Sequence, residues 1–551
     1  MTIFRHAYAL SGSTLVSFNP ATPSVGTSIP VTGLTAGQTL VGIDVRPTNG
    51  LLYGLGVNAA TDTATLYNIS VLTGVATIVG SFGSAGDLPA SGYGFDFNPL
   101  PVADRIRVTT DTGLNFRVNP NNGSLTAIDT AISGASDISG VAYTNDGTNV
   151  TTLYTLDSIS DQLMIQGGPG GNPNPNGGAQ NPVGPVGVGD FSTANGFDIP
   201  PGVDSGLALL THGGAVQLYS INLATGAGTL IGNFPPGTSA SGLAILNTPS
   251  GDDFNGDSNG DILWRNDSGQ VYFWNMNGTA INSEGGAAHA LVPTDWHIQG
   301  RGDFDGDNKS DILWRHDSGQ TYIWEMNGLN VKAEGSIVHA AVGTDWQIQG
   351  TGDFDADGRS DILWRHDSGQ VYIWEMNGLG VKAEGGVAHA AVTSDWHIQR
   401  IGDFNGDAIS DILWRHDSGQ VYIWEMNGLG IKAEGGVAHA LVPPDWQIQG
   451  LGDFNNDGNS DILWRHDSGQ VYIWEMDGLG IKAEGGVAHA LVPNDWHVQD
   501  IGDFDGDGKS DILWRQDGSG QVYVWEMNGL GIKAEGGVAH APVPSEWHIF
   551  S

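Results

Sequence analysis

The sequence predicts an all-β chain made of two consecutive β-propellers, five-bladed in the first half and six-bladed in the second. Near-identical units recur every 50 residues through residues 253–551, and the first half repeats more weakly at intervals of 46–56 residues. Within each unit, short β-branched and aromatic segments alternate with turns rich in Gly, Asn and Asp, a pattern of strands and hairpins. Repeats of this length with several strands each are typical of propeller blades.

The first half, residues 1–247, carries five copies of a segment that reads Gly, apolar, Asp or Ala, apolar. The copies are Gly42–Val45, Gly94–Phe97, Gly140–Tyr143, Gly196–Ile199 and Gly242–Ile245. The last copy has no unit behind it, and the first unit, beginning at Ala7, has no copy in front. Pairing these two ends closes a ring of five blades and removes the open edges. Within the copies, Asp44, Asp96 and Asp198 are interpreted as hydrogen-bond acceptors that cap the blades.

Two segments are predicted to lie outside the strands. Residues 248–252 are interpreted as a linker, with residues 253–551 forming the C-terminal domain. Residues 167–178 are rich in Gly and Pro, so we expect a long hairpin loop inside one blade that does not pack.

Each repeat of the second half contains a nine-residue acidic loop that predicts a calcium site. In the copy from Asp303 to Asp311, aspartates occupy positions 1, 3, 5 and 9. Calcium takes six to eight oxygen ligands at roughly 2.3–2.6 Å, which alternate side chains of a tight loop supply. Position 7 contributes only its backbone carbonyl, so Lys309 is acceptable there. Position 12 is Trp314 and the flanks resemble strands, which excludes an EF-hand.

We expect about six Ca²⁺ ions, one in each C-terminal blade. The predicted ligands are Asp253, Asn255, Asp257, Asn259 and Asp261; Asp303, Asp305, Asp307, Lys309 and Asp311; Asp353, Asp355, Asp357, Arg359 and Asp361; Asp403, Asn405, Asp407, Ile409 and Asp411; Asp453, Asn455, Asp457, Asn459 and Asp461; and Asp503, Asp505, Asp507, Lys509 and Asp511.

With these loops, residues 253–551 resemble the FG-GAP/VCBS repeats of integrin-type calcium-binding β-propellers. The first half resembles, more loosely, a bacterial β-propeller-like domain of unknown function with similar Gly-Phe-Asp strands, and this resemblance implies no activity. The first C-terminal unit lacks a strand before its loop, whereas the chain ends in such a strand at 546–550. We therefore expect the chain end to complete the first blade.

Composition narrows the class of function. A net charge of −40 argues against nucleic acid, since phosphate attraction needs a basic face, and the absence of cysteine excludes disulfides and thiol chemistry. No apolar run reaches the ~18 residues of a transmembrane helix, and no secretion signal is visible at Met1–His6. Loops of this kind in extracellular modules bind calcium at about 10⁻⁴–10⁻³ M. We therefore expect a bacterial protein that is extracellular or at the cell surface.

All 18 tryptophans lie in the second half, three per repeat. Large aromatics that recur in every blade usually pack between blades. The alternative is that one series forms a platform for a sugar ring. The candidate ligand-binding residues are Trp314, Arg315, Trp324, Trp364, Arg365, Trp374, Trp414, Arg415, Trp424, Trp464, Arg465 and Trp474. A recurring histidine before Ala, as at His289, is expected to donate structural hydrogen bonds. The Arg-Gly-Asp sequence at 301–303 is expected to be accidental.

No nucleophile with an adjacent base and no catalytic carboxylate pair is recognisable, so we do not predict an enzyme. The sequence favours a secreted, calcium-stabilised binding or adhesion protein, in its sharpest form a multivalent carbohydrate-binding propeller whose partner is a glycan or surface polymer. The alternative is a structural component that self-assembles with copies of itself into a surface layer or extracellular matrix.

Overall fold

The computed structural model describes most of the chain. The described residues are 6–550 without 19, 21–22, 25, 48–50, 72, 84–85, 101–103, 134–136, 145–149, 192–195, 201–204, 236–237, 247–251, 258, 288, 290, 338–340, 388–390, 438–440, 488–490 and 539. Most of the expected linker at 248–252 lies outside this set.

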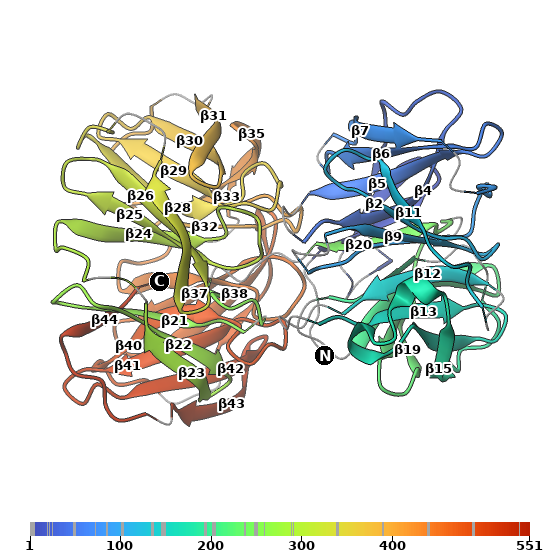
Figure 1. Cartoon of the computed structure of the whole chain (residues 1–551). Coiled ribbons are helices and arrows are strands. Elements are labelled where there is room, and N and C mark those ends of the chain that lie inside the picture. The colour runs from blue at the N-terminus through green and yellow to red at the C-terminus, as the bar shows by residue number, and fades with distance from the viewer. Residues whose placement is uncertain are drawn as a thin grey trace. The chain divides into compact units, whose positions relative to one another are not determined.

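The fold is all-β, as predicted, and the chain divides into two compact units, Ile3–Asn247 and Thr248–Ser551. The described strands form antiparallel four-stranded sheets, which Figure 1 shows gathered around a centre in each unit. In the described part of the chain, no helix has the length and hydropathy needed to cross a bilayer.

The first unit contributes five sheets in the described residues. They are β20 (Gly242–Leu246), β1 (His6–Ser11), β2 (Thr14–Phe18), β3 (Gly26–Pro30); β4 (Thr39–Val45), β5 (Leu52–Asn58), β6 (Thr63–Ile69), β7 (Ala76–Phe82); β8 (Tyr93–Phe97), β9 (Ile106–Thr110), β10 (Asn115–Val118), β11 (Leu125–Ile128); β12 (Ile138–Tyr143), β13 (Leu153–Asp157), β14 (Gln162–Gln166), β15 (Gln180–Pro185); and β16 (Gly196–Asp198), β17 (Ser205–His212), β18 (Ala215–Asn222), β19 (Gly228–Asn233).

The second unit contributes six sheets in the described residues. They are β44 (Trp547–Ile549), β21 (Ile262–Asn266), β22 (Val271–Asn277), β23 (Ala280–Gly286); β24 (Trp296–Gly302), β25 (Asp311–His316), β26 (Thr321–Asn327), β27 (Asn330–Ser336); β28 (Trp346–Gly352), β29 (Asp361–His366), β30 (Val371–Asn377), β31 (Gly380–Gly386); β32 (Trp396–Gly402), β33 (Asp411–His416), β34 (Val421–Asn427), β35 (Gly430–Gly436); β36 (Trp446–Gly452), β37 (Asp461–His466), β38 (Val471–Asp477), β39 (Gly480–Gly486); and β40 (Trp496–Gly502), β41 (Asp511–Gln516), β42 (Val522–Asn528), β43 (Gly531–Gly537).

The repeated glycine of the first unit has a packing role. A side chain on Gly42 would place its Cβ 2.5 Å from the Cβ of Phe95, because the first strands of neighbouring sheets approach closely there. Corresponding close approaches join 94 to 141, 140 to 197, 196 to 243 and 242 back to 43. Each copy of the segment therefore packs its glycine against the apolar residue of the next copy, in a closed cycle.

Within each unit, the two ends of that unit pair in a single sheet, as predicted. Strand β20 pairs with β1, and the chain end β44 pairs with β21, with Trp264 opposite Ile549. The first sheet of each unit therefore contains strands from both ends of that unit. This pairing removes the free edges that separate ends would expose.

The Gly- and Pro-rich segment 167–178 is a hairpin loop between β14 and β15, as expected, but the expectation that it does not pack is wrong. It contains two 3₁₀ turns, η2 (Pro169–Gly171) and η3 (Pro175–Gly177), and Pro175 is buried. Buried Arg107 donates to the Asn176 side chain (2.5 Å), and Gln166 donates to the Pro175 carbonyl (2.9 Å). The core thus supplies partners for the loop's polar groups, which is what lets irregular backbone be buried.

Candidate metal loops and ligand pocket

In five repeats the acidic loop joins the first and second strands of its sheet, and in the first repeat the loop leads into β21, which pairs with the chain end β44. Position 9 begins the second strand or directly precedes it and is nearly inaccessible to solvent; in the second repeat it is Asp311. One carboxylate oxygen of Asp311 accepts the Met326 N–H (2.7 Å), and the other accepts the Phe304 N–H (2.8 Å). The other five loops repeat this pair of bonds. Position 9 therefore fixes the loop to the third strand of its own sheet.

Position 1 organises the turn itself. The Asp303 carboxylate accepts N–H groups from Gly306 (2.6 Å) and Asn308 (2.7 Å), so the backbone curls around it. Burial, followed by the charges of the neighbouring carboxylates, holds the pKa of Asp303 and Asp311 well above their ordinary values. In the fourth repeat the same two causes raise the pKa of Asp403 to about 7. Carboxylates this close together repel one another unless a cation balances their negative charge.

In the described part of the chain, buried polar atoms at position 3 lack the partner that a bound cation would supply. Oδ1 of Asp355 and the side-chain amide of Asn405 are buried without a hydrogen-bond partner among the described residues. Buried polar atoms rarely lack partners, and an ion is one explanation when they do. In three loops, carboxylate oxygens lie within 4.8 Å of one another: Asp303, Asp305 and Asp311; Asp353, Asp355 and Asp357; and Asp503, Asp505 and Asp511. All-oxygen donors of this kind suit a hard cation such as Ca²⁺.

The remaining loops differ because Asn occupies position 3. They are the loops at 253–261, 403–411 and 453–461, each with three carboxylates. Their Asp residues keep the position 1 and position 9 hydrogen bonds of the other loops. The position 7 carbonyls stay a prediction.

A lysine beside the loops was not recognised as part of the site. Lys332 in β27 lies 2.6 Å from Asp305 and 2.8 Å from Asp307. Corresponding lysines contact loop carboxylates in four further repeats: Lys382, Lys432, Lys482 and Lys533. The recurrence of Lys in a short Lys-Ala-Glu sequence was the available signal. Only the fold shows that this strand returns beside the loop, about 25 residues later in the chain.

The six loops are also hydrogen-bonded to one another. The N–H of position 8 donates to the carbonyl of position 1 in the preceding loop, as from Ser360 to Asp303 (2.6 Å). The remaining bonds run from Ser310 to Asp253, Ser410 to Asp353, Ser460 to Asp403, Ser510 to Asp453 and Gly260 to Asp503. The last bond closes the cycle. Ordering one loop therefore restrains its neighbours directly.

The tryptophans proposed as ligand platforms are buried, so that interpretation is wrong. Trp314, Trp324, Trp364, Trp374, Trp414, Trp424, Trp464 and Trp474 are 1–4% exposed. Paired rings such as Trp364 and Trp374 lie 4.8 Å apart between sheets, which leaves no face for a sugar. They form the core between sheets, in agreement with the inter-blade packing that the sequence favoured.

The arginines proposed with them link neighbouring sheets. Arg365 donates to the Trp396 carbonyl (2.6 Å), and its guanidinium lies 5.2 Å from the ring centre of Trp414. Arg315, Arg415 and Arg465 make corresponding contacts with the next sheet. Cation–π stacking and carbonyl contacts hold these guanidinium groups in structural roles. Arg365 still lines the pocket described below.

The third tryptophan series is half-buried. Trp346 lies 4.9 Å from the ring of His366 and 5.7 Å from Tyr372. The His366 imidazole also approaches Asp345 (2.9 Å) and Ser368 (2.7 Å). The same group recurs beside Trp296, Trp396 and Trp446, and it leaves part of each indole accessible.

The recurring histidine series is only partly described. His289 packs 4.4 Å from Trp324 and lies 3.2 Å from Glu334. His540 makes the corresponding contacts with Trp274 and Glu284. His339, His389, His439 and His489 lie outside the described residues.

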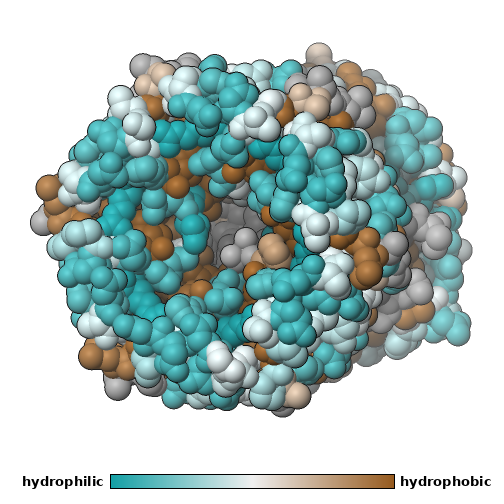
Figure 2. Space-filling view, turned by 90° about the vertical axis from the view of Figure 1, so that its left-hand side faces the viewer, coloured by the Kyte–Doolittle hydropathy of each residue, from teal (hydrophilic) through white to brown (hydrophobic). Residues whose placement is uncertain are grey.

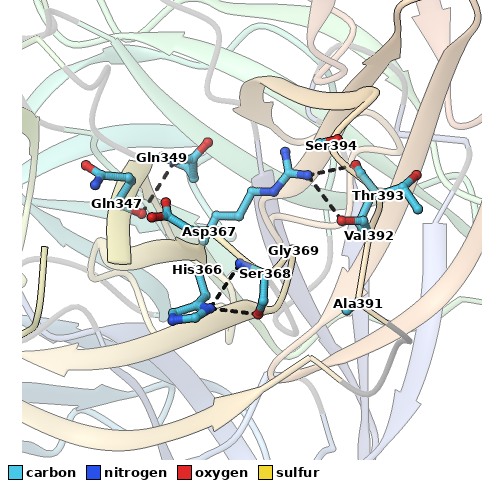
Figure 3. Close-up of a pocket in the computed structure, with 11 residues that line it drawn as sticks. Gln347, Gln349, His366, Asp367, Ser368, Gly369, Ala391, Val392, Thr393 and Ser394 are labelled. Carbon is cyan, nitrogen blue, oxygen red and sulfur yellow. Dashed lines mark hydrogen bonds between the residues drawn. The ribbon is translucent and has the colours of Figure 1, made fainter. Parts of the chain in front are cut away.

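A polar pocket of about 500 Å³ opens between adjacent blades. Figure 3 shows Gln347, Gln349, His366 and Asp367 on one side, facing the segment with Thr393 and Ser394. The floor includes Arg365, which donates to the Thr393 carbonyl (3.1 Å). Apart from Val392 and Ala391, the lining groups are hydrogen-bonding side chains and backbone. Figure 2 shows one face of the molecule, on which hydrophilic side chains cover most of the surface around a hollow.

In the first unit, Asp44, Asp96 and Asp198 accept hydrogen bonds between blades, as predicted. Their carboxylates accept N–H groups of the next sheet, from Phe97 (2.7 Å), Tyr143 (2.9 Å) and Ile245 (2.8 Å). Their oxygens also converge within 4.8 Å. Burial, with added repulsion between carboxylates, holds the pKa of Asp44 and Asp96 well above the ordinary value. Burial alone raises the pKa of Asp198 to about 6.

The Arg-Gly-Asp sequence is buried, in agreement with its being accidental. Arg301 is enclosed by the carboxylates of Asp252 and Asp500, and Asp303 is a loop residue. A partner protein therefore has no access to this tripeptide.

Two family models match parts of the chain. Residues 14–244 match a domain of unknown function (DUF4394), and residues 303–364, 353–414 and 453–514 match the FG-GAP-like repeat. The second unit is therefore an FG-GAP-type propeller, as its acidic loops predicted.

No curated protein sequence matches the chain significantly. Matching solved structures include the Dos1 propeller, 10% identical at a TM-score of 0.26, covering 74% of this chain and 86% of that one. Another is the computationally designed Ika8 protein, 8% identical at a TM-score of 0.22, covering 81% and 98%. With TM-scores this low, neither supports an inference about this chain.

Proposed function

We propose that this chain is an extracellular, non-enzymatic binding protein whose second unit is a calcium-stabilised, six-bladed propeller, with a five-bladed propeller before it. FG-GAP-like repeats are typical of extracellular adhesion-type propellers, which supports the location and the broad class. The acidic loops would hold Ca²⁺ through positions 1, 3, 5 and 9. Bound calcium supplies charge compensation there, and the loop-to-loop hydrogen bonds would carry the resulting order around the ring.

The ligand we propose is a carbohydrate, bound at the pockets between blades. The pocket at Gln347 and Gln349 carries this proposal, because amides, a hydroxyl and the exposed Asp367 carboxylate face one space. Such mixed donors and acceptors match the hydroxyl groups of a neutral sugar. An anionic ligand is disfavoured, since the guanidinium of Arg365 is already committed to carbonyls and Asp367 adds negative charge.

Repetition strengthens weak binding. The pocket glutamine recurs as Gln299, Gln349, Gln399, Gln449 and Gln499. Shallow sugar sites are individually weak, but several linked sites on one rigid ring gain avidity without new contacts. A polymer with repeating sugars is therefore the favoured partner.

A glycan array probed with the full chain in calcium tests this function. Replacing the five pocket glutamines by alanine should abolish binding. A matched variant replaces Gln320, Gln370, Gln420, Gln470 and Gln521, which lie outside the pocket, and should bind like the wild type. A blank array in calcium, or equal loss in both variants, would contradict the carbohydrate proposal.

Self-assembly is the second candidate, and one observation favours it. Leu291, Leu441 and Leu491 occupy one repeat position and are 59–61% exposed. Exposed leucines recurring around a ring offer contacts to another copy of the chain. Concentration-dependent filaments in the absence of sugar, lost on replacing these leucines by serine, would support this alternative.

A further inference from the structure

The six acidic loops differ in whether a lysine side chain from the same sheet contacts their carboxylates. In five repeats, an ammonium group sits on the loop carboxylates, 2.5–2.8 Å away. In the first repeat, Asn282 in β23 takes the place of that lysine and is exposed. The first repeat also has Asn275 where the others have a glutamate, as at Glu475.

We propose that these lysines are tethered counter-cations that compete with calcium, so that the loop of the first repeat is the one that depends fully on the ion. This inference rests on the proposed calcium binding. A positive charge in direct contact with ligand carboxylates both stabilises the ion-free loop and repels an arriving divalent ion. Both effects lower the gain in stability that calcium brings.

The first and fifth loops provide a matched comparison. Both have Asp, Asn, Asp and Asp at positions 1, 3, 5 and 9, and both are followed by a loop with lysine at position 7. They differ in that Lys482 contacts Asp457 (2.7 Å), whereas the described cation that acts on the first loop is Arg301, whose charge reaches Asp261 while its guanidinium is bonded to Asp252 and Asp500. The charge of Glu475 in the fifth repeat opposes that of the lysine, but of these two side chains only Lys482 is in direct contact with a loop carboxylate in the described part of the chain. The direct contact of Lys482 therefore decides the direction of the effect.

The first loop lies in the blade where the ring closes. It belongs to the sheet in which β44 pairs with β21, where the ring closes. Its neighbours on either side are the loops at 303 and 503, joined to it by backbone hydrogen bonds. The closing blade would therefore keep its ion down to lower calcium concentrations than the other blades. It would lose the most stability once that ion leaves, because the other five blades keep a lysine on their loop carboxylates.

Calcium binding to the full chain, measured by equilibrium dialysis with ⁴⁵Ca, tests this inference. Lys432→Asn with Lys482→Asn should convert two sites to tighter binding, by about tenfold each, because a half-exposed charge near a divalent ion is only partly screened. Asn282→Lys should weaken one site by a similar factor. Arg400→Asn, which removes a charge bonded only to carbonyls, serves as the charge control.

Thermal unfolding in chelator adds a readout that needs no calcium. The double lysine variant should melt at a lower temperature than the wild type in EDTA, and Asn282→Lys at a higher one. Wild-type binding of calcium with affinities unchanged in all variants would overturn this inference alone. A wild type that binds no calcium would overturn both the inference and the proposed calcium sites.

Discussion

The guanidinium of Arg301 lies 2.6 and 2.7 Å from the two carboxylate oxygens of Asp500, although 199 positions separate them in the chain. The same group contacts Asp252 (2.7 Å) and donates to the Phe550 carbonyl (2.8 Å). Arg301 belongs to β24 and Asp500 to β40, the first strands of the two sheets on either side of the closing sheet. This buried ion cluster therefore ties the closing sheet to both of its neighbours.

Replacing Arg301 by methionine should destabilise the second unit by about 3–5 kcal/mol, because two buried carboxylates lose their partner. Urea unfolding followed by tryptophan fluorescence measures this unit alone, since all 18 tryptophans lie in it. Arg400→Met is the control, because Arg400 is exposed, donates to carbonyls and acts on Asp500 only through its charge, without a direct bond. Equal losses of stability in both variants would contradict a stabilising role for this buried ion cluster.

Deleting residues 545–551 should remove β44 and leave the β21 edge unpaired. Exposed strand edges promote association between chains. The expected result is aggregation on light scattering, together with a lower melting temperature of the second unit. A truncated chain that remains monomeric and equally stable would show that β44 is not needed to close the ring.

The repeats made the fold class and both closing strands predictable. Hydrophobic alternation, turn residues and the missing strand of the first repeat are local or terminal features of the sequence. The acidic loops were recognisable for the same reason, because their ligands lie within nine residues. The Arg301 cluster was not, since it depends on which inner strands flank the closing sheet.

Exposure of the tryptophans was the part that sequence could not decide. Trp364 is buried and Trp346 is half-buried, yet both stand in aromatic strand sequences of the same kind. Which face of a strand meets the next blade depends on the packing of neighbouring sheets. The lysine contacts were missed for a related reason, because the fourth strand of a blade returns to the loop through a hairpin.

Substitution of single tryptophans should separate these roles. Trp364→Ala should cost about 3–5 kcal/mol of stability, because it opens a large cavity between sheets. Trp346→Ala should cost clearly less, since that ring is already in part solvated. Denaturant unfolding of the two variants checks the order; a larger loss for Trp346 would contradict the burial described here.

The first unit should lose stability as pH rises. Asp44, Asp96 and Asp198 converge with raised pKa values, which reach about 6 for Asp198, while Ala142 and Ala244 occupy the other two copies of this position. A carboxyl group whose pKa is higher in the folded state contributes stability below its unfolded pKa of about 4, and that contribution disappears as pH rises through the folded value.

Calorimetry of the full chain between pH 5 and 8 measures this effect. The transition of the first unit is the one that tryptophan fluorescence does not follow, because all tryptophans lie in the second unit. The free energy of unfolding of the first unit should fall across this range by on the order of 1–3 kcal/mol, which is measured as a lower melting temperature. Asp96→Asn keeps the hydrogen-bonding shape but removes one charge, so its melting temperature at pH 8 should be higher and its pH dependence flatter. A variant with an unchanged pH profile would count against shared repulsion among the three carboxylates.

Calcium dependence of the two melting transitions tests the central claim most directly. At a free calcium concentration ten times Kd, each site bound only in the folded state adds about 1.4 kcal/mol. Calorimetry in 1 mM calcium and in EDTA should therefore show a large difference in the melting temperature of the second unit, whose transition tryptophan fluorescence identifies. The melting temperature of the first unit should differ little. Equal shifts of both transitions, or no shift of the tryptophan-reported one, would contradict calcium stabilisation of the second unit.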